Sequence, residues 1–281
     1  MSLPICLLVD NGSLRPDAIF SLRRVAMKLS FETPFEVLPL GLLHSNKVDP
    51  SLLDGEAGQT IGTFLSSTKG KEHDKLIVLP FFFGPSRGIT DWLIEKLEEW
   101  RLINSARSYR VLDPLYKYKE VELANALKQE VELEYTKNNL NGYNVALVDH
   151  GTPVLEVNQV REDVGEVLAK SLGPHVNDFS TCSMERRDGD KYSFNEPLLE
   201  NLLRQWGEQG VDGVIVALFF LLSGRHAGKE GDLVEICTNA RQEFPKMNIF
   251  LTNPLGEHEI IFEILKARLH SVESDLNVDG I

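Results

Sequence analysis

The chain carries one series of short motifs twice, and this internal repeat constrains its fold more than any other feature. Three motifs recur in the same order at offsets of 138–140 residues. The pairs are VDNGS at 9–13 with VDHGT at 148–152, IVLPFFF at 77–83 with IVALFFL at 215–221, and DPL at 113–115 with NPL at 253–255. This agreement in order and offset predicts a duplicated domain of about 140 residues.

The length agrees with two domains, since a chain of 281 residues is about twice the size of a common folding unit. We therefore expect an N-terminal unit over residues 1–137 and a C-terminal unit over residues 138–281. The Asn-rich segment KNNLNG at 137–142 is typical of a turn and is the expected boundary. A unit of this size can bury its own core without disulfides or a structural metal.

Short apolar runs alternate with amphipathic stretches in both halves. The apolar runs predict strands at 3–10, 35–40, 75–83, 110–112, 145–149, 176–182, 213–221 and 248–251. The amphipathic stretches predict helices at 16–29, 59–65, 90–102, 119–135, 155–172, 196–206, 231–243 and 257–269. This alternation is typical of parallel sheets with right-handed crossovers. We therefore expect an α/β fold of two duplicated, open, flavodoxin-like parallel sheets with a cleft between them.

Composition and charge exclude several classes of function. The net charge of −13 disfavours nucleic-acid binding, which needs a basic surface. No apolar run approaches the roughly 18–20 residues that span a bilayer, so we expect no membrane segment. The three cysteines are far apart, which disfavours a disulfide framework and favours a reducing compartment. The first residues lack a signal-peptide pattern, so we expect a cytoplasmic protein, or an organellar stromal one if a transit peptide has been removed.

Only the second copy of the repeat carries histidines at its strand ends. His150 stands where the first copy has Asn11, and His226 stands where it has Gly88. Ligands bind at the carboxyl ends of the strands in an open parallel sheet, so both imidazoles are expected at one edge. Neutral imidazole binds divalent Fe, Co, Ni and Zn, and two such ligands leave coordination positions open. The pair predicts a metal-handling site; the alternative is a β–α turn in which His150 has no role.

Glu185 follows the expected second strand of the second half and is a candidate proton acceptor beside the histidines. Its loosely aligned counterpart in the first copy is His44. A solvated loop glutamate is the alternative interpretation. Cys182, in the same strand, is more simply a small buried residue than a metal ligand. His258 is more simply part of a helix start than part of the site.

The glycine-rich loop at 224–232 has only part of a nucleotide-binding pattern. Ser223 replaces the first glycine of that pattern and Glu230 its final hydroxyl residue, so a phosphate loop is not expected. Arg225 in this loop is equivalent to Arg87 in the first copy. Guanidinium groups suit carboxylate ligands, so both arginines are candidate substrate-binding residues. The alternative is a structural role in which they bond to loop carbonyls.

At these residues the chain resembles the class II tetrapyrrole chelatases, in particular the sirohydrochlorin cobaltochelatases and ferrochelatases. That family has an aliphatic strand ending in His-Gly-Ser, which is similar to 148–152 here. It also has a strand ending in Phe-Phe-Leu-x-x-Gly-Arg-His, similar to 219–226, and a Pro-Leu-Gly-x-His segment, similar to 254–258. Both halves align with the family unit, so the resemblance covers essentially the whole chain.

The resemblance implies insertion of a divalent metal ion (Co, Fe or Ni) into a metal-free modified tetrapyrrole such as sirohydrochlorin. It implies that His150 and His226 bind the metal or accept pyrrole protons, and that Glu185 assists them. The metal is then a substrate, and no permanently bound cofactor is expected. The first copy, which has Asn11 and Gly88, is expected to form one wall of the cleft.

Two other interpretations stay open. In the first, the same fold is a non-catalytic carrier of a tetrapyrrole or a metal ion. In the second, the protein is an unrelated small-molecule enzyme in which His150 and His226 act as acid and base. The sequence also leaves the metal open, because affinity follows a general order of metals more than the ligand set. A monomer and a homodimer are both compatible with it.

Overall fold

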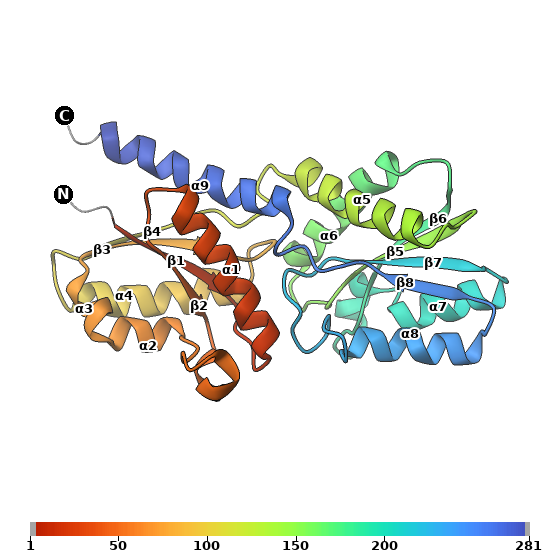
Figure 1. Ribbon diagram of the computed structural model, residues 1–281, viewed down its shortest axis with the longest axis horizontal. Coiled ribbons are helices and arrows are strands. Elements are labelled where there is room, and N and C mark those ends of the chain that lie inside the picture. The colour runs from red at the N-terminus through yellow and green to blue at the C-terminus, as the bar shows by residue number, and fades with distance from the viewer. Residues whose placement is uncertain (1–3, 279–281) are drawn as a thin grey trace. The chain divides into compact units, whose positions relative to one another are not determined.

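The computed structural model describes residues 4–278, which fold into two compact units. Unit 1 contains the described residues up to Lys117 and from Gly256 onward, and unit 2 is Tyr118–Leu255. Each unit is an α/β sandwich, in which helices flank a four-stranded parallel sheet (Figure 1). The expected class of two duplicated open parallel sheets is confirmed. Within residues 4–278, no helix has both the length and the apolar character that a membrane span needs.

The sheet of unit 1 has the strand order β2-β1-β3-β4. Its strands are β1 (Ile5–Asp10), β2 (Val37–Gly41), β3 (Lys75–Pro80) and β4 (Ser108–Val111). Its helices are α1 (Pro16–Glu32), α2 (Ile61–Ser66), α3 (Thr68–Glu72), α4 (Ile94–Leu102) and α9 (Glu259–Val278), with short helical turns at Ser45–Lys47, Pro50–Leu53 and Gly88–Leu93. β1 is buried along its whole length, as expected for a central parallel strand covered on both faces.

Unit 2 repeats this architecture with the strand order β6-β5-β7-β8. Its strands are β5 (Tyr143–Asp149), β6 (Val176–Ser183), β7 (Gly213–Leu218) and β8 (Asn248–Leu251). Its helices are α5 (Glu120–Lys137), α6 (Leu155–Ser171), α7 (Leu199–Glu208) and α8 (Asp232–Glu243), with a 3₁₀ turn at Asp190–Asn195. α1 and α6 each contain 17 residues and begin 139 positions apart. Equivalent helices of the two units are thus separated by the same number of positions as the repeated sequence motifs.

The compact units differ from the expected units, 1–137 and 138–281, in the placement of two helices. α5 packs against α6 and β7 and so belongs to unit 2, whereas α9 packs against α1 and belongs to unit 1. An ion pair of 2.5 Å between Lys28 and Glu259 joins α1 to α9. Amphipathic spacing predicts that a helix is buried, but it does not identify the sheet that the helix covers. The Asn-rich segment is therefore an internal turn of unit 2, and the expected boundary is wrong.

The central strands β3 and β7 end three residues earlier than expected, at Pro80 and Leu218. The last residue of each pairs with β1 or β5, as Val9 with Pro80 and Val148 with Leu218. The N–H of Phe219 still donates to the Val148 carbonyl at 2.8 Å, and the chain then leaves the sheet. The edge strands β4 and β8 end earlier still, since their last pairs are Val111 with Val78 and Leu251 with Val216. The apolar runs therefore continue beyond the part of β3 and β7 that is paired on both sides. The loops that follow carry the candidate site.

Candidate metal centre

The carboxyl ends of β5 and β7 lie side by side in the sheet of unit 2. From β5 the chain crosses to β6 on one side, and from β7 it crosses to β8 on the other side, so this edge is a topological switch point. His150 follows β5 directly, and His226 lies in the loop between β7 and α8. The sequence therefore brings the two histidines to one place by fold topology, although 76 positions separate them.

A tight turn after β5 sets the position of His150. Gly151 has a φ of +89°, and a Cβ at this position would lie 1.9 Å from the carbonyl oxygen of Glu185. The N–H of Glu185 donates to the His150 carbonyl at 3.2 Å, which fixes the start of the β6–α7 segment against this turn. The carboxylate of Glu185 then lies 3.4 Å from His150 Nε2. Only glycine fits the turn, because it tolerates both the positive φ and the close approach.

The two imidazoles face each other with ring centroids 4.4 Å apart and planes inclined at 64°. Nδ1 of His150 lies 3.0 Å from the Gly151 carbonyl oxygen, and Nδ1 of His226 lies 2.6 Å from a carboxylate oxygen of Asp232. Both partners are acceptors, so the neutral tautomer with its proton on Nδ1 and its lone pair on Nε2 makes each of these two contacts a hydrogen bond. The carboxylate–imidazole pair is the arrangement that commonly orients a metal-binding histidine.

A buried ion pair supports the turn from inside the unit. Arg161 of α6 is 1% exposed, and its guanidinium donates to Asp149 Oδ1 at 3.0 Å and to the Ser183 hydroxyl. The Ser183 hydroxyl donates to the same Asp149 oxygen at 2.7 Å, as does Gly151 N at 3.0 Å. Asp149 precedes His150, so this network holds the peptide from which the imidazole extends.

A second buried side chain attaches the other end of the turn. The Asn195 amide is completely buried; its Oδ1 accepts from Thr152 N and its Nδ2 donates to Thr152 O, both at 2.9 Å. Sequence reasoning missed Asn195 and Arg161, since neither lies in a recognisable motif. The repeat did offer one indication for Arg161. This arginine lies on the apolar face of α6, at the position where the first copy of the repeat has Leu22.

The structure places the remaining predicted residues in different surroundings. Arg225 lies at the centre, with an exposed side chain whose Nε is 3.7 Å from Asp232 Oδ2. Arg87 lies in unit 1, directly before the helical turn at Gly88–Leu93. Cys182 is completely buried, and burial raises the pKa of its thiol far above the ordinary value, which disfavours the thiolate that a metal needs. His258 precedes α9 in unit 1, where its Nδ1 accepts from Ile260 N at 3.2 Å.

The equivalent turn in unit 1 identifies the true counterpart of Glu185. Leu43 N donates to Asn11 O at 3.3 Å, as Glu185 N donates to His150 O. The counterpart of Glu185 is therefore Leu43, and the expected alignment with His44 is wrong by one residue. The offset is already 142 at Gly41 and Ser183, which pair with Asp10 and Asp149, so the shift arises between the starts of α1 and α6 and the ends of β2 and β6. Unit 1 thus has neither the two imidazoles nor the carboxylate of unit 2. The equivalent residues are Asn11, Gly88 and Leu43.

The candidate centre in unit 2 offers two imidazoles and no complete cage. Among residues 4–278, no group of three or more His, Cys, Asp or Glu side chains is arranged to hold a metal ion. A site with two nitrogen donors leaves most coordination positions to other molecules. Such a site suits an ion that is held briefly and passed on better than a permanent structural metal.

Comparison with known proteins shows a similarity to the sirohydrochlorin chelatases. Residues 144–272 match the model of the CbiX family, and this segment contains both histidines, Glu185 and Asp232. The predicted resemblance to the class II chelatases is confirmed. A relative from Arabidopsis thaliana, the chloroplastic sirohydrochlorin ferrochelatase, is 25% identical over 136 residues, which are 48% of this chain and 55% of the relative. The chain thus spans about half the length of this chelatase.

Two solved chelatase structures share the fold over nearly the whole chain. SirB from Bacillus subtilis with Fe³⁺ superposes with a TM-score of 0.68 at 13% identity, over 96% of this chain and 95% of that chain. The sirohydrochlorin chelatase SirB from Bacillus subtilis subspecies spizizenii, in complex with cobalt, gives a TM-score of 0.66 with the same identity and coverage. The chelatase-like fold therefore includes unit 1, although the CbiX match is confined to the second half.

Proposed function

We propose that unit 2 inserts a divalent metal ion into a metal-free tetrapyrrole of the sirohydrochlorin class. The observation that carries this proposal is the pair of imidazoles 4.4 Å apart, each with its Nδ1 beside an acceptor. In this state His150 Nε2 and His226 Nε2 are the two metal donors. The ion keeps open positions, into which the pyrrole nitrogens can enter as the imidazoles release it.

Insertion also requires acceptors for the two protons that leave the ring nitrogens. The carboxylate of Glu185 is 61% exposed and lies 3.4 Å from His150 Nε2, so it can receive a proton directly or through the imidazole. No covalent intermediate is needed. The protein contributes by positioning the ion against the ring and by accepting protons at the same edge of the sheet.

Cations in the neighbouring loops suit a substrate that carries several carboxylates. Arg225 is 76% exposed, and its planar guanidinium can bind a carboxylate with two hydrogen bonds. Arg187 and Lys191 lie in the segment that follows Glu185, where both lower the pKa of the Tyr192 hydroxyl. These local charges oppose the net charge of −13 of the whole chain. We assign substrate binding to Arg225, and Arg87 of unit 1 keeps the same predicted role.

The test is an anaerobic absorbance assay of sirohydrochlorin with Co²⁺, Fe²⁺ or Ni²⁺, each with and without the protein. The proposal expects the spectrum of the metallated ring to form faster than in the protein-free control, and the fastest ion identifies the metal. Saturable binding of the ring without faster metallation would indicate a carrier. No spectral change with any of the three ions would favour an unrelated enzyme. The oligomeric state and the compartment stay predictions.

Asp232 is expected to control the affinity of the centre through His226. Asp232→Asn removes the charged acceptor at 2.6 Å from His226 Nδ1, so we expect metal binding to weaken by roughly 10–100-fold. Titration with Co²⁺, followed by its visible absorbance, measures this change. Glu230→Gln alters an exposed carboxylate in the same loop and is the matched control. Equal affinity in the two variants would exclude this role for Asp232.

A further inference from the structure

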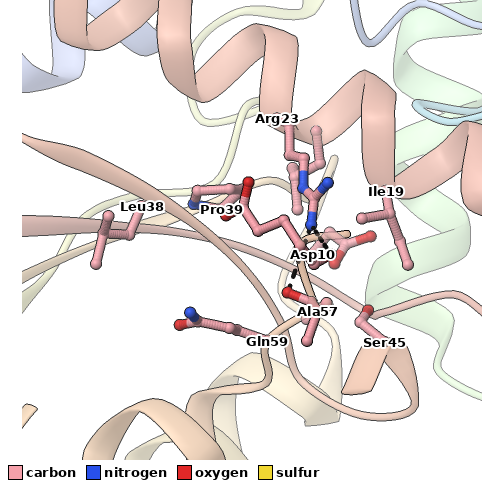
Figure 2. Close-up of a pocket in the computed structure, with 12 residues that line it drawn as sticks. Asp10, Ile19, Arg23, Leu38, Pro39, Ser45, Ala57 and Gln59 are labelled. Carbon is pink, nitrogen blue, oxygen red and sulfur yellow. Dashed lines mark hydrogen bonds between the residues drawn. The ribbon is translucent and has the colours of Figure 1, made fainter. Parts of the chain in front are cut away.

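Unit 1 contains a cavity of about 60 Å³ between α1, β2 and the segment that precedes α2 (Figure 2). Asp10 at the end of β1, Leu22 of α1 and Gly41 of β2 contribute to its wall. Glu56 and Ala57 form part of the outer wall, and both are exposed to solvent. The cavity is independent of the proposed metal centre, which lies in unit 2.

The repeat shows what occupies the corresponding space in unit 2. At the common offset of 139 residues, Asp10 corresponds to Asp149 and Leu22 corresponds to Arg161. Gly41 pairs with Asp10 in the sheet as Ser183 pairs with Asp149. In unit 2, these three equivalents form the buried network in which the Arg161 guanidinium lies 3.0 Å from Asp149. Unit 1 therefore keeps the carboxylate and lacks the arginine and the serine.

Asp10 has no cationic partner to replace that arginine. Asp10 is 8% exposed, and the N–H of Gly12 donates to its Oδ1 at 2.9 Å. No side chain of the described residues donates to it. Burial raises the pKa of Asp10 to about 7, and the backbone hydrogen bonds only partly oppose this shift.

The other charged groups of the cavity wall are already engaged or exposed. The guanidinium of Arg23 donates to the carbonyl oxygens of Leu53, Glu56 and Ala57 at 3.2, 2.7 and 3.4 Å. Figure 2 shows Arg23 beside Ala57 in the wall. Glu56 is exposed to solvent, and it is the backbone carbonyl of this residue that accepts from Arg23. Among the charged residues that line the described cavity, Asp10 is the buried one, and no ion pair joins its carboxylate to Arg23.

We propose that this cavity binds a small guanidinium cation, with the Asp10 carboxylate holding it as Asp149 holds the guanidinium of Arg161. The volume of about 60 Å³ accommodates roughly four water-sized groups, the number of heavy atoms in a guanidinium ion. A planar cation with parallel N–H donors also matches a carboxylate in shape. The ligand class is a free guanidinium or a monosubstituted guanidine whose substituent extends toward the exposed wall.

The test measures thermal unfolding of the full chain in low millimolar methylguanidinium chloride, against sodium chloride at equal ionic strength. At pH 8.5 we expect methylguanidinium to raise the midpoint of the wild-type protein above the sodium control. Asp10→Asn keeps an acceptor for Gly12 N but removes the charge, and it should lose this difference. Leu22→Arg supplies the missing guanidinium from α1, so it should also lose the response. Gly41→Ser is unsuitable, since a Cβ at Gly41 would lie 2.5 Å from Ser45 Oγ.

The pH dependence adds a second measurement. The cation needs the ionised carboxylate, so binding should weaken as the pH falls through the raised pKa of Asp10. For a pKa of about 7, the apparent Kd from titration calorimetry should be roughly 30-fold weaker at pH 5.5 than at pH 8.5. The proposal is overturned if methylguanidinium and sodium give the same midpoint in the wild-type protein, which indicates a water-filled cavity only. An equal response in wild type and Asp10→Asn, or in wild type and Leu22→Arg, overturns it as well.

Discussion

Replacing His226 with alanine is expected to lower the rate of metal insertion by roughly 100-fold or more. His226 supplies one of two imidazole nitrogens, and its loss leaves a single donor that cannot hold the ion against water. His150→Ala should have a similar effect, because the ring centroids lie 4.4 Å apart and the proposed centre uses both imidazoles to hold one ion. The double variant should be little worse than either single variant, since residues that act as a unit are not additive. Initial rates with sirohydrochlorin and the preferred ion measure these effects.

The control for this prediction is another histidine in the same unit. His175 precedes β6, at the opposite end of the sheet from the centre, and its ring stacks on Tyr135 at 5.0 Å. His175→Ala should therefore retain the wild-type insertion rate. If His150→Ala and His226→Ala also retain it, the assignment of the metal centre is wrong.

Arg161→Leu is expected to lower the free energy of unfolding of unit 2 by roughly 3–5 kcal/mol. The variant leaves the side chain of Asp149, which is only 13% exposed, without its cation. The large cost comes from the unpaired buried charge more than from the lost attraction. Asp149→Asn combined with Arg161→Leu should recover part of this loss, because it removes that charge. The protein has two units, so hydrogen exchange of β5 and α6 peptides in increasing urea is the appropriate measurement.

The matched control is an arginine whose ion pair is exposed. Arg204 on α7 lies 3.5 Å from Glu243, and both side chains are 51% exposed. Arg204→Leu should change the stability by less than about 1 kcal/mol. A comparable loss in the two variants would show that the Asp149–Arg161 pair has no special structural importance.

The sheets and the histidine pair could be predicted from the sequence, because both depend on local patterns. Apolar runs identify buried parallel strands, and the switch-point rule places the residues after β5 and β7 at one edge. The strand ends were less predictable, since β3 and β7 end at Pro80 and Leu218 although their apolar runs continue. Glu185 was located for the same reason as the histidines, as it follows β6 at that edge.

The supporting residues could not be predicted, because their roles depend on contacts between distant segments. Arg161 lies on an ordinary helix, and only the structure shows that it reaches Asp149. Asn195 contacts Thr152 across 43 positions. Asp232 and Glu230 lie in the same loop, and only the distance of 2.6 Å between Asp232 Oδ2 and His226 Nδ1 shows which carboxylate contacts the imidazole. The placement of α5 and α9 is likewise a tertiary property.

The exchange of α5 and α9 has a consequence for the history of the chain. Within one polypeptide it resembles the domain swapping that links separate protomers. A shortened gene that encoded only the second copy would lose α5, and with it part of the cover of the sheet that carries the histidines. Under the proposed function, selection for metal insertion by unit 2 would therefore also preserve α5, which the first copy of the repeat encodes. Deleting the first copy is then expected to destabilise the sheet that carries the histidines.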